Sequence, residues 1–366
     1  DYVDMGYYDE ITKAKIYPKI VYYYLKKQIS FQKYWNVELQ KEDLNLCENA
    51  IEKLRNAGRT YYLIELLEIK LEISEAMPYG TVPENLEEKE LLSVIKNLYT
   101  EYNVPVYMQD CTYLYQQKWI FALSDVLRIR REMFGLTQEQ LCEGICSVKS
   151  LRRAEKGQTD MQRETLKKIL NRLGLSGQMQ WSRLITSDRK VIRTEEKLGD
   201  YINDQDFATA YQQLGNLKLQ VSLDIPQNKQ YFLEKQALLE FEQGKVKREE
   251  FVKMEKEALE CTLRVENLLQ QKRVYLTEQE ISCIRNSWKG MEKKEKEESI
   301  KFLLEFYEKY ILKNGFSEAI SMYEFVTESA VNELGNMGEH EWAEEIDRRA
   351  IRASLQCRRV WEDRKS

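Results

Sequence analysis

The chain has few residues that break helices, with 5 Pro and 15 Gly among 366 residues. Strong runs of β-forming residues are also missing. Lys, Glu, Leu and Gln dominate instead, and these residues favour the helical conformation. Such a composition argues against a β-rich fold, and the sequence therefore predicts an all-α protein.

Long apolar runs and histidine are scarce as well. No apolar run approaches the roughly 20 residues that cross a bilayer as a helix, so we expect no membrane partner. Cys142 and Cys146 are one helical turn apart, but no further Cys and no His lies near them, and the chain's single histidine is His340. A zinc site is therefore not expected. Seven scattered cysteines and no signal peptide predict reduced thiols and a cytoplasmic location. Because the sequence starts at Asp1 rather than Met, we expect a preceding segment.

The usual catalytic motifs are also missing from the sequence. It has no Gly-rich phosphate loop, no GxSxG and no grouping of carboxylates with histidine. Adjacent acids such as Glu249 and Glu250 are typical of a solvated helix face. We therefore predict no enzyme activity and no cofactor.

The clearest local pattern lies in residues 124–175. Thr137 is followed three residues later by Gln140, which is the spacing of a capping box at a helix start. Ser147 is a good N-cap for the next helix. Glycines follow the first, third and fourth predicted helices, as expected where a chain leaves a helix with positive φ. The four predicted helices span residues 124–134, 138–144, 148–156 and 163–173.

The third of these helices has a basic outer face. Leu151 and Ala154 are predicted to face inward, while Lys and Arg residues point outward. Two short helices joined by a tight turn, the second with a basic face, suit the major groove of DNA. Thr137 and Gln138 would place free backbone N–H groups against a phosphate. Residues 124–193 carry a net charge of +7 and the remainder −12, which concentrates positive charge on this face. A small helical bundle with solvated charges is the alternative interpretation.

The segment GLTQEQLCEGICSVKSLRRAEKG resembles the Xre/Cro-type helix-turn-helix family. The form EGICS is similar to a branch of Firmicute regulators that includes peptide-pheromone receptors of the Rgg/PlcR type. The resemblance implies that Glu155 pairs with Arg130 or Arg131. Arg152 and Ala154 depart from the family pattern, so its base preference does not carry over. The predicted DNA-binding residues are Thr137, Gln138, Ser147, Lys149, Ser150, Arg152, Arg153 and Lys156.

Helices separated by short turns are predicted on both sides of this segment. DQDFATAYQQL and GEHEWAEEIDRRAI resemble parts of tetratricopeptide repeats, which are about 34 residues long, although other helical hairpin repeats fit too. Residues 49–59 and 349–359 share three identities at an offset of 300, which hints at a duplicated plan. After the central segment, helices are predicted at residues 195–203, 207–221, 226–243, 247–259, 277–289, 293–313, 315–335 and 339–364.

The resemblance to pheromone receptors also implies a peptide-binding inner face. Asn286 falls where those receptors often carry a polar residue that grips a peptide backbone. For each of the other candidates, an ordinary surface role is at least as good an interpretation. The predicted peptide-binding residues are Asn286, Tyr231, Lys235, Arg285 and Tyr323.

These observations predict a cytoplasmic bacterial transcription regulator. Its helix-turn-helix domain (122–180) would be flanked by tetratricopeptide-like helical hairpin arrays (1–121 and 181–366). The partners would be double-stranded DNA, a signalling peptide and a second copy of the chain, because one such domain reads only a half-site. The alternative is a protein-interaction scaffold with an occluded central domain. Exposure of Lys149, Arg152 and Arg153 distinguishes the two.

Overall fold

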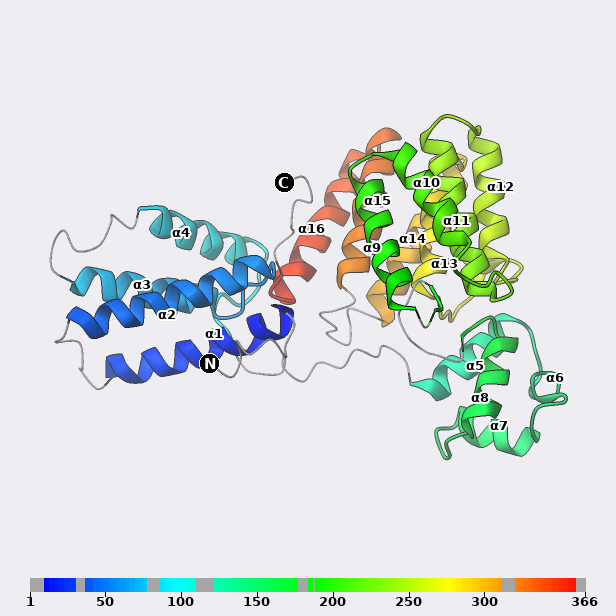
Figure 1. The fold of residues 1–366 in the computed structure, drawn as a ribbon, viewed down its shortest axis with the longest axis horizontal. Coiled ribbons are helices and arrows are strands. Elements are labelled where there is room, and N and C mark those ends of the chain that lie inside the picture. The colour runs from blue at the N-terminus through cyan, green and yellow to red at the C-terminus, as the bar shows by residue number, and fades with distance from the viewer. Residues whose placement is uncertain are drawn as a thin grey trace. The chain divides into compact units, whose positions relative to one another are not determined.

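A computed structural model describes residues 10–30, 37–77, 86–109, 122–176, 184–186, 188–310 and 320–359. Within these ranges every regular element is a helix, apart from one isolated β-bridge (Figure 1). The predicted all-α class is confirmed. No helix in the described ranges has the length and apolar character needed to cross a membrane. Parts of three predicted helices, at 311–319 and 360–364, lie outside the described residues.

The chain divides into two compact units. The first contains residues 1–118, 312–327 and 341–366, and the second contains residues 119–311 and 328–340. The helix-turn-helix segment therefore shares a unit with the helices that follow it, and the last residues group with the first ones. The predicted boundaries at 121 and 180 fall outside the described residues and stay a prediction.

The first unit is built around a core of buried Leu, Ile and Tyr side chains. Leu25, Leu54 and Leu66 have no exposed surface, and they come from three successive helices. Apolar residues three or four positions apart place one face of each helix in this core. The four N-terminal helices are α1 (Glu10–Ser30), α2 (Val37–Asn56), α3 (Leu63–Ala76) and α4 (Leu86–Glu101).

The end of α16 (His340–Gln356) joins this first unit through backbone contacts. Arg59 and Arg359 form the isolated antiparallel bridge. The amide of Thr60 donates to the carbonyl of Arg358 over 2.9 Å. The guanidinium of Arg358 in turn donates to three successive carbonyls, those of residues 105–107. The two segments that share the offset of 300 thus meet at their last residues.

The second unit starts with four short helices that have a hydrophobic core of their own. Val126, Leu127, Leu151 and Leu170 are fully buried in this core. The helices lie within one or two residues of the predicted ranges, so the local signals placed them well. They are α5 (Leu123–Met133), α6 (Gln138–Cys142), α7 (Val148–Glu155) and α8 (Arg163–Arg172).

Helices packed in sequence order make up the rest of the second unit (Figure 1). α9 packs on α10, α10 on α11, α11 on α12, and α12 on α13. This order confirms the predicted helical hairpins. α9 starts six residues before the prediction, because Asp188 caps it by accepting from the amide of Lys190. The helices are α9 (Arg189–Asn203), α10 (Phe207–Lys218), α11 (Pro226–Glu242), α12 (Arg248–Leu259), α13 (Glu278–Ser287) and α14 (Lys293–Tyr310), and α15 (Ile320–Asn336) contributes to both units.

Candidate nucleic-acid interface

Two caps fix where α6 and α7 begin. The hydroxyl of Thr137 accepts from the amide of Gln140 over 3.2 Å, and the Gln140 side chain accepts from the amide of Thr137 over 2.8 Å. The hydroxyl of Ser147 accepts from the amide of Ser150 over 3.2 Å. The predicted capping box and N-cap are both confirmed. Since the caps satisfy amides that the helices leave unpaired, the turn between α6 and α7 has a defined geometry.

A chain of polar contacts links α5, α6 and α7. Arg131 donates to both carboxylate oxygens of Glu155, over 2.7 and 3.2 Å. The side-chain amide of Gln138 donates to Glu155 over 2.6 Å, and its carbonyl oxygen accepts from Nε of Arg152 over 3.3 Å. Of the two arginines proposed for Glu155, Arg131 is the partner. The network orients Gln138, which in turn restrains the guanidinium of Arg152.

The polar face of α7 is open to solvent. Lys149, Arg153 and Lys156 are exposed and form no ion pair with any described residue. Leu151 and Ala154 are buried on the opposite face. Burial or pairing with acids would have favoured an occluded domain, and within this unit neither is present. Of the eight predicted DNA-binding residues, Gln138 is half-buried, and the exposed ones are Thr137, Ser147, Lys149, Ser150, Arg152, Arg153 and Lys156.

A buried arginine joins this domain to the helices that follow it. Arg130 on α5 is fully buried and donates twice to the carboxylate of Glu280 on α13, over 2.9 and 3.1 Å. It also donates to the carbonyls of Leu173, Thr262 and Tyr275. The hydroxyl of Thr262 donates to the same carboxylate over 2.8 Å. Every contact is charge-assisted, and most are buried, so the domain is held firmly against the start of α13.

The contact between Arg130 and Glu280 was not predicted from the sequence, although the sequence carries one signal for it. Arg130 lies four residues after Val126 and three before Met133, and both of these neighbours are buried. An arginine on the apolar face of a helix requires a buried partner. The sequence offers many acids and no indication that Glu280, 150 positions away, is the one.

Four of the five predicted peptide-binding residues gather around buried Glu234. Asn286 donates to Glu234 over 2.8 Å and to Glu255 over 3.2 Å, and it accepts from Arg285. Lys235 lies 3.0 Å from the Glu234 carboxylate. Tyr231 precedes Lys235 by one helical turn on the same helix, and the ammonium of Lys235 lies 5.7 Å from the centre of its ring. Tyr323 belongs to the first unit.

Burial limits what these residues offer to a ligand. Tyr231, Asn286 and Tyr323 are each at most 2% exposed, while Lys235 and Arg285 are half-buried. Peptide contact by the five residues stays a prediction. For the three buried side chains, it requires the surrounding helices to separate.

The two carboxyls at this site differ in their protonation. Burial raises the pKa of Glu255 well above 4.5, and the neighbouring Glu234 raises it further. Burial also acts to raise the pKa of Glu234, but the ammonium of Lys235 and other donors lower it overall. Oε2 of Glu255 has no hydrogen-bond partner among the described residues. The pair therefore combines a carboxylate at Glu234 with an acid that retains its proton far more readily.

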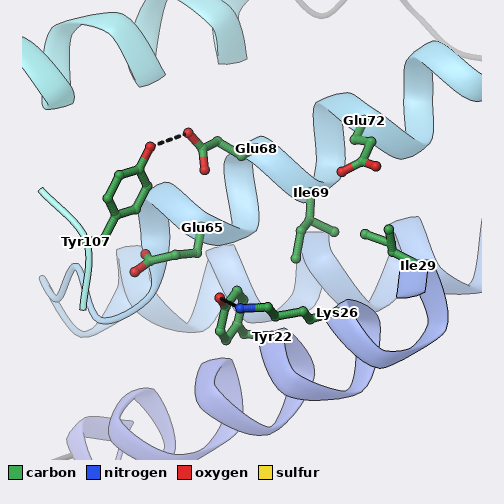
Figure 2. Close-up of a pocket in the computed structure, with 8 residues that line it drawn as sticks. All are labelled: Tyr22, Lys26, Ile29, Glu65, Glu68, Ile69, Glu72 and Tyr107. Carbon is green, nitrogen blue, oxygen red and sulfur yellow. Dashed lines mark hydrogen bonds between the residues drawn. The ribbon is translucent and has the colours of Figure 1, made fainter. Parts of the chain in front are cut away.

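A separate pocket lies in the first unit, between α1 and α3 (Figure 2). Its volume is about 350 Å³. Glu68 accepts from the hydroxyl of Tyr107 over 2.9 Å, and Lys26 donates to the hydroxyl of Tyr22 over 3.0 Å. Glu65 is buried and accepts from the amide of Met108. These polar groups already have partners within the protein, and none of the residues was predicted as a site.

Residues 127–178 match the family model described as Helix-turn-helix. This segment is a helix-turn-helix domain. The chain also resembles the crystal structure of Bacillus thuringiensis PlcR in complex with the peptide PapR7 and DNA, with a TM-score of 0.35 and 20% identity. That match covers 64% of this chain and 80% of the other, and it is too distant to assign any functional residue. No curated protein matches the chain.

Proposed function

We propose that this protein is a transcription regulator that binds operator DNA through α7 of its helix-turn-helix domain. The supporting observation is the exposed basic face of α7, set beside an ordered polar network. A helix of this size fits the major groove, where Arg and Lys reach guanine edges or phosphates. Lys149, Ser150 and Arg153 would contact bases or the adjacent backbone. Thr137 and Ser147 would contact phosphates at the two helix starts.

The network around Glu155 supports a role for Arg152 in contacting base edges in the major groove. A free arginine loses several rotamers when it binds, and that loss opposes binding. Here Gln138 already restrains the guanidinium, and Glu155 restrains Gln138. Arg152 would therefore enter the groove partly pre-organised.

We further propose that the protein acts as a homodimer under the control of a peptide. One helix-turn-helix domain reads a half-site, and two copies are needed for a palindrome. Control would run along α13, which carries Glu280 near its start and Asn286 near its end. These residues are about 9 Å apart along the helix axis. A peptide that binds one arrangement of α11, α12 and α13 better than another would move the helix on which the DNA-binding domain rests.

The test is binding of the full chain to a pool of fluorescent double-stranded DNA at two salt concentrations. We expect selective binding that weakens steeply as salt rises, because each neutralised phosphate releases counterions. The double variant Arg152→Ala/Arg153→Ala should lose it. A matched variant, Lys253→Ala/Lys256→Ala, removes two exposed lysines of α12 and should bind as the wild type does. Circular dichroism checks that both variants are folded.

Failure of the wild type to bind at low salt would contradict the proposal. It would instead favour a protein-interaction scaffold whose helix-turn-helix domain is structural. Equal losses of DNA affinity in the two double variants would indicate that DNA is attracted by the overall charge of the protein and is not recognised by α7. Peptide control is tested separately, since DNA binding without any response to added peptide would contradict only that part.

A further inference from the structure

Two cysteine thiols are in contact inside the turn of the helix-turn-helix domain. Cys142 is the last residue of α6, and Cys146 directly precedes Ser147, the N-cap of α7. Their sulfurs are 3.5 Å apart, with the Cys146 thiol donating to Cys142. The Cys142 thiol points toward the carbonyl of Ser147 at 3.7 Å. Among the described cysteines, this is the one pair with its sulfurs in contact.

The two thiols differ in access. Cys142 is 3% exposed and belongs to the domain core, whereas Cys146 is half-buried at the edge of the turn. An oxidant from solvent therefore reaches Cys146 first. Cys142 lies directly behind it, where a second thiol can resolve an oxidised sulfur.

The turn between the two cysteines has room to adjust. A disulfide bond is about 2.05 Å long, so the sulfurs must approach each other by about 1.5 Å. Gly144 lies between them with φ +69°, and a Cβ placed on it would meet nothing within 4 Å. The amide of Cys146 donates to the carbonyl of Cys142 over 3.1 Å, so the backbone already brings the two residues together. A small change of this turn closes the gap.

We propose that Cys142 and Cys146 are a peroxide-sensitive dithiol that closes to an intramolecular disulfide. The Cys146 thiolate attacks one oxygen of hydrogen peroxide, the O–O bond breaks, and the sulfenic acid and hydroxide form. The sulfur of Cys142 then attacks the sulfenic sulfur and the S–O bond breaks. The departing hydroxide leaves as water with the Cys142 proton. In total, two thiols are oxidised to one disulfide and one peroxide is reduced to two waters.

Disulfide closure acts directly on α7, which is the reading helix, the one that the proposed function places in the major groove. It pulls Cys146 toward α6 and removes the Cys142 thiol from the carbonyl of Ser147. Because Ser147 caps α7, the start of the reading helix shifts or loses its cap. On the proposed DNA-binding function, on which this consequence rests, the oxidised protein binds DNA about tenfold more weakly than the reduced protein.

The resolving step is expected to be faster at alkaline pH. Burial, which is the largest cause, and the hydrogen bond from Cys146 together raise the pKa of Cys142 to about 12. The nucleophile in thiol chemistry is the thiolate. At pH values below that pKa, the thiolate fraction of Cys142 rises about tenfold for each unit by which the pH is raised. The rate of disulfide closure should rise with it.

The test follows the thiols of the full chain by mass spectrometry after treatment with hydrogen peroxide and alkylation. Cleavage after Arg131 and Lys149 places both cysteines in one tryptic peptide, residues 132–149. We expect this peptide to lose two hydrogens and both alkylation sites, and to regain them after reduction with dithiothreitol. Cys146→Ser should abolish the change. Cys142→Ser should leave a sulfenic acid at Cys146 that dimedone traps, and Cys261→Ser should behave as the wild type.

Two results would overturn the proposal: a peptide that keeps two free thiols after peroxide treatment, or one in which Cys146 is oxidised to sulfinic acid without a disulfide. DNA binding is then compared between the oxidised and reduced wild type and Cys146→Ser. Disulfide closure in a protein that binds no DNA in either state would contradict the proposed function and not the dithiol. Closure with unchanged affinity for DNA would contradict the regulatory consequence alone.

Discussion

Arg130 and Glu280 form a salt bridge of 2.9 Å in which both side chains are completely buried. One belongs to the helix-turn-helix domain and the other to the start of α13. Glu280 also closes the capping box of α13 by accepting from the amide of Thr277 over 2.9 Å. The same carboxylate thus contacts the helix-turn-helix domain and takes part in the cap that begins α13.

Removal of this carboxylate should be strongly destabilising. We expect Glu280→Ala to lower the free energy of unfolding of the second unit by about 3–5 kcal/mol, because Arg130 is left charged and buried without its partner. Urea unfolding followed by circular dichroism measures the change. Glu305→Ala breaks the exposed pair with Lys309 and should cost about 1 kcal/mol or less. Equal effects of the two variants would show that the buried pair contributes no more than a surface pair.

Gly174 lies against Thr262, between the same two parts of the second unit. Its φ is +71°, and a Cβ there would lie 1.9 Å from the carbonyl oxygen of Thr262. Gly174→Ala should therefore separate the end of α8 from Thr262 and expose the Arg130 network. Gly135→Ala is the matched control, because Gly135 has φ +63° and open space around it. It should cost only the backbone strain, about 1 kcal/mol.

Thermal unfolding compares the two glycine variants. We expect Gly174→Ala to lower Tm clearly more than Gly135→Ala does, and to increase hydrogen exchange at the start of α13. If both variants lower Tm equally, the close approach at Thr262 does not constrain the domain.

The hydrogen bonds from Arg131 to Glu155 should matter more for DNA binding than the positive charge of Arg131 does, because they restrain the side chains next to α7. Arg131→Lys retains a positive charge but cannot donate in parallel to both oxygens of Glu155. We expect about 1–2 kcal/mol lower stability and weaker DNA binding, because Gln138 and Arg152 lose their restraint. Arg128→Lys, at a half-buried position of α5 outside this network, should change neither property. Unaltered DNA binding in Arg131→Lys would contradict the role assigned to this network.

Local signals predicted the helix-turn-helix domain well because its structure is set by neighbours in sequence. The capping box of Thr137 and the cap at Ser147 involve residues three positions apart. The Arg131–Glu155 pair came from the family pattern. No local signal could find Glu280 as the partner of Arg130, or predict that Arg59 and Arg359 meet. Those contacts depend on how distant helices pack, and apolar periodicity does not specify which helices become neighbours.

Asn286 shows the same limit at the proposed ligand site. Its position on α13 was predicted, but its burial against Glu234 and Glu255 was not. The sequence pattern around an asparagine on a helix is the same whether its side chain faces solvent or a pair of buried acids. The acids come from α11 and α12, so only the packing of three helices reveals them.

The buried acid at Glu255 should make stability depend on pH. Its pKa is raised in the folded protein, so between pH 4.5 and that raised value the folded state keeps a proton that the unfolded state loses. Stability from this group is therefore complete at low pH and falls as pH rises through the window, by at most about 1.4 kcal/mol per pH unit. Glu234, Lys235 and Arg285 surround the group and contribute their own charges. Burial raises the pKa of the nearby Cys283 thiol well above 9, so this group stays neutral over the same range.

Glu255→Gln isolates this contribution, because glutamine mimics the protonated acid and still accepts from Asn286. We expect the variant to match the wild type near pH 5 and to exceed it in stability at pH 8, with a difference that grows with pH. Glu257→Gln, an exposed acid on the same helix, should show no such growth. Urea unfolding at a series of pH values under reducing conditions gives both differences. A constant difference for Glu255→Gln would mean that Glu255 is already ionised in the folded protein, with Asn286, Lys235 and Arg285 sufficient to hold two neighbouring carboxylates.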